Sequence, residues 1–251
     1  MGWAGDGSRE GLVTGRTVGL LTASVADARP LVDVLVARGV TPTVLVASSL
    51  RFDPGERRSD LGVLVNLVDD RATPAVRAFA TEYLAYLADI EVPTVNGLDA
   101  LVVGASRARR VALLAHLGVT HPPARVVADR QGVPAALADL GDPGDHEVDE
   151  GPPVVVQVRP HVGDAVRIEY VAGRQHAATA NGEPVTVDLA IGRLGAAVVQ
   201  TGQIEFGGVS FAVDHATQRP VCVGVDTHPP ASPRALDALA DHTLRRAGLA
   251  A

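Results

Sequence analysis

The fold of this chain is decided by Asp60-Leu-Gly-Val-Leu-Val-Asn-Leu-Val68, a nearly unbroken apolar run. Such a run lacks the alternation of a half-exposed strand and predicts a strand buried on both faces, as in parallel sheets. Pro74 follows a polar loop and opens a helix predicted over 75–88. The chain returns as a strand in Val92-Pro-Thr-Val-Asn96. A strand, a helix and a strand joined by short connections predict parallel strands with a helix packed on the sheet.

The same alternation extends toward the N-terminus. Thr17-Val-Gly-Leu-Leu-Thr22 is a short apolar run, a helical pattern over 27–38 ends at a glycine, and Thr43-Val-Leu-Val-Ala47 is a further strand. Residues 16–97 are therefore predicted to form one open α/β domain with a parallel sheet. Residues 1–15 are glycine-rich and polar, which predicts a flexible leader.

The chain changes character after an acidic loop, rich in glycine and proline, that is predicted over 141–153. Before this loop the patterns predict a helical turn over 98–103, helices over 106–117 and 131–140, and an extended stretch over 122–127. After it, short apolar runs separated by turns predict an antiparallel sheet. The elements predicted there are strands over 154–159, 166–171, 175–179, 208–213 and 221–225 and helices over 187–201 and 233–247. The predicted fold class is α/β, an open parallel N-terminal unit followed by a half built on an antiparallel sheet with packed helices.

Composition excludes several kinds of function. The chain has 251 residues and a net charge of −7, and its arginines are scattered, which argues against nucleic-acid binding. A single cysteine cannot form an internal disulfide, and no apolar run approaches the length of a membrane span. We therefore expect a cytoplasmic protein with no nucleic-acid or membrane partner. All 22 basic side chains are arginine, so the chain has no lysine to contact phosphate as a compact ammonium.

Four stretches in chain order carry a family resemblance. They are the strand and helix from Asp60 with Val92-Pro-Thr-Val-Asn-Gly97; Ser106-Arg107 with Leu114, Gly118-Val119 and Pro122; Val155-Val-Gln157 with Gly163-Asp164 and Arg167-Ile-Glu-Tyr-Val-Ala-Gly173; and Gly208-Val-Ser210 with Gly224-Val-Asp-Thr-His-Pro229. In this order they resemble the ATP-grasp superfamily, in the branch of ribosomal-protein glutamate ligase and glutathione synthetase. The resemblance implies that residues 98–150 are a remnant of the first ATP-grasp subdomain and that residues 151–251 are the second.

The resemblance also assigns candidate site residues. Arg107 stands where the family holds ATP phosphates with a lysine. Gln157 falls on the strand after the phosphate loop or, in an alternative alignment, at a second phosphate-binding lysine. Arg167 stands where family members use arginine toward the acceptor or phosphate, and it is the best single candidate for retained ligand binding. Asp226 falls on one of the three metal-ligand positions.

The same resemblance shows what this chain lacks. The other two metal positions fall on Ser210 and Gly224, which offer no carboxylate for Mg²⁺. The segment between Pro122 and Gln157 is too short for the strand pair and glycine-rich phosphate loop of the family. Phosphoryl transfer depends on positioning and on neutralising charge as it develops. These losses together predict that ATP-dependent ligation is gone.

The predicted function is therefore that of an ATP-grasp-like binding, scaffold or regulatory component of a biosynthetic pathway, with no cofactor required. ATP and Mg²⁺ are expected ligands only if nucleotide binding is retained. The expected partner is an active ligase, another enzyme of the pathway or a second copy of the chain. Two alternatives stay open. One is an active carboxylate–amine ligase that proceeds through an acyl-phosphate, and the other is a small-molecule binding protein that uses the cleft without ATP.

Other candidate sites have plainer explanations. His215, Asp226 and His228 are residue types that bind metals, but their spacing matches no metal motif, and we expect histidines in loops near a strand end. Cys222 lies in an apolar strand, which predicts a buried thiol. Three arginines, at 107, 109 and 110, begin a predicted helix. They are expected on a solvated helix face, with an anion site as the alternative.

Overall fold

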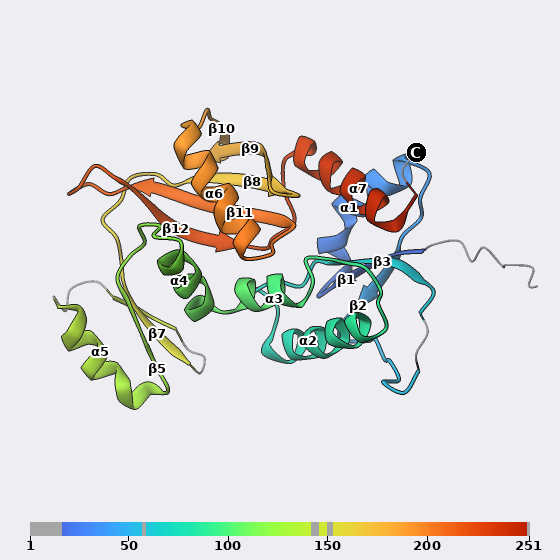
Figure 1. Cartoon of the computed structure of the whole chain (residues 1–251), viewed down its shortest axis with the longest axis horizontal. Helices are drawn as coiled ribbons and strands as arrows, with labels where there is room; N and C mark the ends of the chain where they lie inside the picture. The colour runs from blue at the N-terminus through green and yellow to red at the C-terminus, as the bar shows by residue number, and fades with distance from the viewer. Residues whose placement is uncertain (1–16, 57–58, 142–145, 150–152, 250–251) are drawn as a thin grey trace, which may run out of the picture.

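The computed structural model describes residues 17–56, 59–141, 146–149 and 153–249. The leader predicted over 1–15 lies outside the described residues. The N-terminal unit contains a parallel sheet of four strands in the order β2-β1-β3-β4 (Figure 1). Its elements are β1 (Thr17–Thr22), α1 (Val25–Ala37), β2 (Thr43–Val46), β3 (Leu61–Asn66), α2 (Pro74–Asp89) and β4 (Thr94–Val95).

Alternate residues of strand β3 face two layers of helices. Val63 and Val65 are buried in a cluster with Leu31 of α1 and Leu239 of α7 (Pro233–Ala247). Leu64 points the other way and lies in a second cluster with residues of α2. Because helices cover both faces, the strand has an unbroken apolar sequence. The predicted parallel N-terminal unit is confirmed.

A small antiparallel sheet follows, reached through α3 (Leu98–Ala105) and α4 (Arg107–His116). Its strand order is β5-β7-β6. Its elements are β5 (Ala124–Val127), a helical turn at 130–132, α5 (Val133–Leu140), β6 (His146–Val148) and β7 (Val154–Val158). Two expectations are corrected here. Strand β6 lies inside the stretch expected to be a loop, and β7 is the central strand of this sheet rather than part of the later meander.

A larger antiparallel sheet has five strands in the order β10-β9-β8-β11-β12 (Figure 1). Its elements are β8 (Val166–Val171), β9 (Arg174–Ala180), β10 (Glu183–Pro184), α6 (Leu189–Thr201), β11 (Phe206–Val213) and β12 (Pro220–Asp226). Ile168 and Tyr170 of β8 are buried in one cluster with Val198 of α6. Since side chains alternate along a strand, Arg167 and Glu169 lie on the opposite face of this sheet.

The C-terminal helix α7 returns to the N-terminal unit, where Figure 1 shows it beside α1. Ala235 and Leu239 of α7 are fully buried in the same cluster as Val18 of β1. Ser232 caps the helix by accepting a hydrogen bond from the Ala235 amide, and Gly248 ends it in the left-handed conformation at φ 68°. The last helix thus completes the core of the first unit.

Asn96 ties the end of β4 to the start of β11. Its Nδ2 donates to the carbonyl oxygen of Phe206 at 2.7 Å, and its Oδ1 accepts from the amides of Glu205 at 2.7 Å and Phe206 at 3.0 Å. Asn96 is fully buried and has a φ of 54°, a left-handed conformation that asparagine tolerates better than most residues. These hydrogen bonds fix the larger sheet against the parallel sheet.

The whole arrangement is a mixed α/β fold with one parallel and two antiparallel sheets among the described residues, which confirms the predicted class. Within the ranges that the structure describes, no helix has both the length and the apolar character needed to cross a lipid bilayer. The parallel sheet and the two antiparallel sheets meet around α3 and α4, and the candidate site lies there.

Candidate functional site

Two adjoining pockets lie where α4, the small sheet and the end of β12 meet, and we call them together the cleft. One has a volume of about 250 Å³, and Arg107, Gln157 and Asp226 contribute to its lining. The other has a volume of about 600 Å³ and shares Asp70, Arg107 and Arg110 with the first. Three of the four residues assigned by the family resemblance therefore line one cavity.

Arg107 is the first residue of α4 and is bonded to strand β6. Ser106 caps the helix by accepting a hydrogen bond from the Arg109 amide at 3.3 Å. Arg107 Nη2 donates to Glu147 Oε1 at 2.8 Å, and this hydrogen bond holds the pKa of Glu147 below its ordinary value. Arg107 Nη1 is buried with no hydrogen-bond partner among the described residues. The side chain that the resemblance aligns with the family's lysine is thus already paired with a carboxylate of the chain itself.

Gln157 lies on β7, the central strand of the small sheet. Its Nε2 donates to the carbonyl oxygen of Pro122 at 3.3 Å, and it is the cross-strand partner of Glu147 on β6. The short segment from Pro122 to Gln157 predicts no strand pair, and the β6–β7 pair corrects that expectation. Gln157 and Glu147 together bring a side-chain amide and a carboxylate to the wall of the cleft.

Asp70 and Arg110 line both pockets of the cleft. Arg110 Nη1 donates to the carbonyl oxygen of Gly104 and lies 3.8 Å from Asp70 Oδ2. Burial lowers the pKa of Arg110, and the charge of Asp70 only partly opposes this effect. Asp70 is not among the site residues predicted from the sequence. Its signal is its position just after a parallel strand, because α/β sheets bind ligands at the carboxyl ends of their strands.

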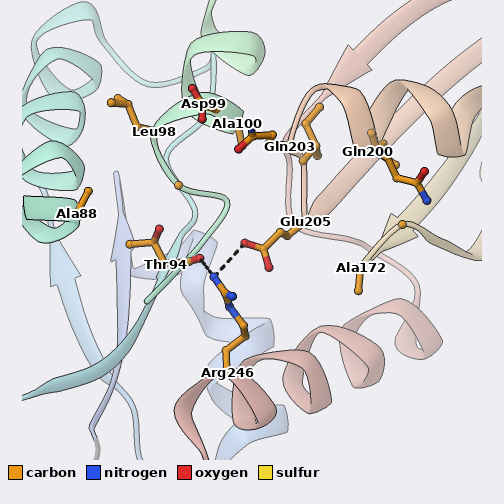
Figure 2. Close-up of a pocket in the computed structure, with 14 residues that line it drawn as sticks. Ala88, Thr94, Leu98, Asp99, Ala100, Ala172, Gln200, Gln203, Glu205 and Arg246 are labelled. Atoms are coloured by element: carbon orange, nitrogen blue, oxygen red, sulfur yellow. Dashed lines mark hydrogen bonds and ion pairs between the residues drawn. The ribbon is translucent and has the colours of Figure 1, made fainter. Parts of the chain in front are cut away.

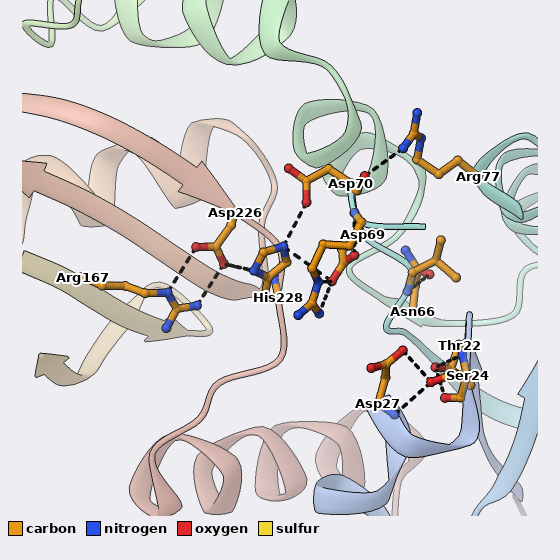
Figure 3. A network of polar contacts seen from close by, with 12 residues as sticks. Thr22, Ser24, Asp27, Asn66, Asp69, Asp70, Arg77, Arg167, Asp226 and His228 are labelled. Carbon is orange, nitrogen blue, oxygen red and sulfur yellow. Dashed lines mark hydrogen bonds and ion pairs between the residues drawn. The ribbon is translucent and has the colours of Figure 1, made fainter. Parts of the chain in front are cut away.

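Arg167 and Asp226 were both assigned to ligand binding, and the structure pairs them with each other (Figure 3). Arg167 Nε donates to Asp226 Oδ2 at 3.2 Å, and Nη2 donates to Oδ1 at 2.9 Å. Gly208 of β11 lies between them, as the cross-strand partner of Asp226. A Cβ at Gly208 would lie 2.6 Å from Arg167 Nε. Because glycine has no side chain, Arg167 can reach across β11 at this position.

Glu169 holds the other side of the Arg167 guanidinium. Arg167 Nη1 donates to Glu169 Oε1 at 2.7 Å, and the Glu169 side chain is 3% exposed. Burial opposes its ionisation, but hydrogen bonds from the Ser232 hydroxyl and the Ala231 amide and the charge of Arg167 outweigh burial and lower the pKa of Glu169. Arg167 is therefore a cation between two carboxylates.

These residues do not fit a magnesium–nucleotide complex. Ser210 and Gly224 are cross-strand partners on the strands where the family places its metal ligands, and neither carries a carboxylate. Both oxygens of Asp226 accept hydrogen bonds from Arg167. Mg²⁺ bound to nucleotide phosphates needs a near-octahedral set of oxygens, normally including one or two free carboxylates. The only carboxylate of the three positions is already neutralised.

His215 and His228, both considered from the sequence as metal-binding residue types, lie far apart in the structure. Strands β11 and β12 pair from Gly208–Asp226 to Val213–Pro220, so His215 lies at the opposite end of this hairpin from His228. The His215 amide donates to the carbonyl oxygen of His161 at 3.0 Å. His228 instead contacts Asp69 and Asp70, which follow β3 (Figure 3). His215, Asp226 and His228 therefore do not form a common site.

Cys222 lines the smaller pocket from strand β12. It is 1% exposed, and burial raises the pKa of its thiol to about 12. A thiol with such a pKa is protonated at neutral pH and lacks the thiolate that acts as a nucleophile. The prediction of a buried core thiol is confirmed.

A further pocket of about 590 Å³ lies between α3, α6 and α7 and was not predicted from the sequence. Figure 2 shows Arg246 of α7 between the carbonyl oxygen of Thr94 and the carboxylate of Glu205. Arg246 Nη2 lies 2.9 Å from the first and 3.7 Å from the second. Glu205 also lies 2.6 Å from His242 Nε2. The Arg246 and Glu205 side chains of this pocket are paired with each other, and none of the residues assigned by the family resemblance lines it, so the cleft is the stronger candidate site.

Comparisons with known proteins agree with this arrangement of elements. No protein-family model and no curated protein matches the chain. Among solved structures, a RimK domain ATP-grasp protein from Sphaerobacter thermophilus is similar with a TM-score of 0.73 at 19% identity, over 91% of this chain and 99% of that one. The ATP-grasp ligase PsnB, complexed with a minimal precursor, gives 0.68 at 13% identity, over 92% and 99%. The macrocyclase MdnC from Microcystis aeruginosa, bound with the precursor peptide MdnA, gives 0.64 at 11% identity, over 91% and 99%.

The chain has the fold of the ATP-grasp ligases, as its sequence resemblance implies. The similar structures include ligases solved with ADP and Mg and with precursor peptides. At identities of this size the likeness concerns the fold. The chemistry of this chain has to be argued from its own residues.

Proposed function

We propose that this chain is an ATP-grasp-fold protein that no longer ligates with ATP and that serves as a binding or scaffold component of a biosynthetic pathway. The observation that carries the proposal is the pairing of Arg167 with Asp226. An arginine and a carboxylate that bind each other through two hydrogen bonds are each withdrawn from phosphate and metal. The pairing of Arg107 with Glu147 supports the same conclusion at the other end of the cleft.

The kind of partner follows from the similar structures and from the charges of the cleft. PsnB and MdnC were solved with precursor peptides, and a peptide is the ligand class that we propose for this chain. The cleft offers a side-chain amide at Gln157 and, at Arg107, a buried guanidinium nitrogen that has no hydrogen-bond partner in the described part of the chain. Peptide carbonyls and carboxylates are acceptors for such donors. An active ligase that modifies the peptide is the proposed protein partner, with a second copy of the chain as the other arrangement.

A thermal shift experiment with ATP and Mg²⁺ tests the loss of nucleotide binding. A ligand at a hundredfold excess over its dissociation constant adds about 2.7 kcal/mol to the free energy of unfolding. We expect no such stabilisation of the wild-type protein. A clear shift that is abolished by Arg107→Ala but kept by Arg109→Ala would overturn the proposal, because Arg109 is exposed on the same helix and lines neither pocket.

A separate assay, the release of ADP, tests the alternative that the chain is an active carboxylate–amine ligase. ADP release that depends on both a carboxylate and an amine would establish that function in place of the scaffold role. For the scaffold role, we expect the protein to co-elute with a precursor peptide or a ligase encoded beside it. A chain that elutes alone when mixed with both would count against that role.

A further inference from the structure

Two acidic residues and a histidine meet between the parallel sheet and the larger antiparallel sheet. Asp69 and Asp70 follow strand β3, and His228 follows strand β12. His228 Nε2 lies 2.9 Å from Asp70 Oδ1 and 3.5 Å from Asp69 Oδ2. One ligand atom from each of the three residues lies within 4.8 Å of the other two. Figure 3 shows the imidazole of His228 directed at both carboxylates.

We call Asp69, Asp70 and His228 the triad. Contacts with other residues hold two of its members, Asp69 and His228, in place. Asp69 Oδ1 accepts a hydrogen bond from the Arg71 amide at 2.9 Å, and the Asp69 side chain is 6% exposed. The His228 amide donates to Asp226 Oδ1 at 3.1 Å, and the same oxygen lies 3.8 Å from His228 Nδ1. A histidine that ligates a metal through one nitrogen usually has a carboxylate, carbonyl or water at the other. Asp226, which is fixed by Arg167, lies on that side of the ring and would have to move closer to Nδ1 to accept its proton.

The separations fit a small tetrahedral ion. Zinc bonds of about 2.0–2.2 Å to nitrogen and oxygen place neighbouring ligand atoms about 3.3–3.6 Å apart. Of the distances from His228 Nε2, the 3.5 Å to Asp69 Oδ2 lies within this range, and the 2.9 Å to Asp70 Oδ1 lies below it. An imidazole beside two carboxylates suits Zn²⁺ and neighbouring transition metals, whereas Mg²⁺ and Ca²⁺ prefer oxygen ligands alone.

A fourth ligand can reach the three residues from the side of Asp70, the one of them that lines the cleft. Asp70 lines both pockets of the cleft, so one side of the triad opens into a cavity of the size that holds water. Arg71 Nε and Nη2 both donate to Asp69 Oδ2, so a metal has to displace this guanidinium. Arg71 is 59% exposed, whereas Arg167 on Asp226 is 26% exposed, so Arg71 can be displaced into solvent more easily. Its departure leaves the buried carboxylate anchored through the other oxygen.

We propose that Asp69, Asp70 and His228 bind a divalent transition metal, with Zn²⁺ as the best-fitting ion, and that the metal fastens the loop after β3 to the loop after β12. The ion takes the place of the proton between His228 Nε2 and Asp70, and a water from the cleft completes its coordination. This site is separate from the positions where the family resemblance puts metal ligands, of which only Asp226 contacts it. Metal binding here is also independent of the peptide role proposed above.

Metal titration of the stripped protein tests this site. After treatment with EDTA and desalting, the full chain is titrated with ZnCl₂ by calorimetry, and its Tm is measured with and without Zn²⁺. We expect one saturable Zn²⁺ per chain, a rise in Tm, and with Co²⁺ the visible absorption of a tetrahedral site. Mg²⁺ at the same concentration should produce none of these effects. Absence of saturable Zn²⁺ binding would overturn the proposal.

Three variants locate the binding. His228→Gln and Asp70→Asn are expected to weaken Zn²⁺ binding by about tenfold or more, as losses in metal shells do. His215→Gln, at the far end of the β11–β12 hairpin, should keep the wild-type affinity. Unchanged affinity in both triad variants, or loss of binding in His215→Gln, would contradict the assignment. If His228→Gln does not fold, Asp70→Asn decides the test, because the Asp70 side chain is 37% exposed.

Discussion

Arg167 and Asp226 bind each other through two hydrogen bonds across β11, a strand to which neither belongs. The contact depends on Gly208, the residue of β11 that lies beneath the guanidinium. Arg167, Gly208 and Asp226 lie on three neighbouring strands, and the contact between the two charged residues depends on the glycine. This contact occupies the groups that the family resemblance assigns to ligand and metal binding. The consequences can be measured at each of these positions and at several others.

The first prediction concerns Gly208→Ala. The added methyl group would lie 2.6 Å from Arg167 Nε, so the guanidinium has to leave its carboxylates, and we expect a loss of about 1–3 kcal/mol in the free energy of unfolding. Urea denaturation measures this loss. Gly224→Ala on β12 is the matched control, because a Cβ there meets Ser210 only at 3.6 Å, an ordinary contact. In an Arg167→Ala background Gly208→Ala should cost much less, and equal costs in both backgrounds would refute the coupling.

The second prediction concerns the pH dependence of stability at Glu169. Its pKa in the folded protein lies below the ordinary value of 4.5. The ionised side chain therefore stabilises the fold above pH 4.5, and this contribution is lost as the pH falls from 4.5 through the lowered pKa. Glu169→Gln should be less stable than the wild type at pH 7 by about 2–3 kcal/mol. The difference should shrink in urea titrations at pH 4 and pH 3, whereas a constant difference would contradict the assignment.

The third prediction concerns the link between the sheets at Asn96. Asn96→Ala removes three hydrogen bonds, two of them buried, and places alanine at a φ of 54°, so we expect a loss of about 2–4 kcal/mol in the free energy of unfolding. Asn181→Ala is the control, since Asn181 has a φ of 51° but makes an exposed hydrogen bond to Asp164. The control should lose less than about 1 kcal/mol. Similar losses in the two variants would mean that the backbone conformation, and not the link, sets the cost.

The fourth prediction concerns Glu147, the partner of Arg107. Glu147→Ala frees a guanidinium at the N-terminus of α4, a place that favours anions. Pyrophosphate should therefore raise the Tm of this variant more than that of the wild type. The gain should vanish in Glu147→Ala with Arg107→Ala. It should also be missing in Asp139→Ala, which removes an exposed carboxylate near Arg125. A gain in the Asp139 variant would point to a general effect of charge.

Much of the fold could be predicted from the sequence because its signals are local. Strand β3 is an apolar run and α2 begins at a proline, and both lie where the pattern predicts. Strand β6 has only three residues, His146–Val148, inside an acidic stretch, and only its pairing with β7 makes it a strand. Local patterns contain no information about such a pairing.

The site could be predicted only in part. The family resemblance assigns Arg107, Gln157 and Asp226 to ligand binding, and in the structure all three line one cavity. The pairing of Arg167 with Asp226 depends on cross-strand register around a glycine, which no local pattern specifies. The contact between His228 and Asp70 joins residues 158 positions apart. It exists only once the two sheets are assembled.

The position of helix α7 has a consequence for how this chain comes to be folded in the cell. The helix fills the core beneath strands made some 170 residues earlier, among them Val65. While the ribosome is still making the middle of the chain, α1 alone covers this face of the parallel sheet, and the apolar side chains that α7 will bury are exposed to water. Folding of the first domain is therefore expected to wait for the last helix, and a truncated or stalled chain should be recognised by chaperones.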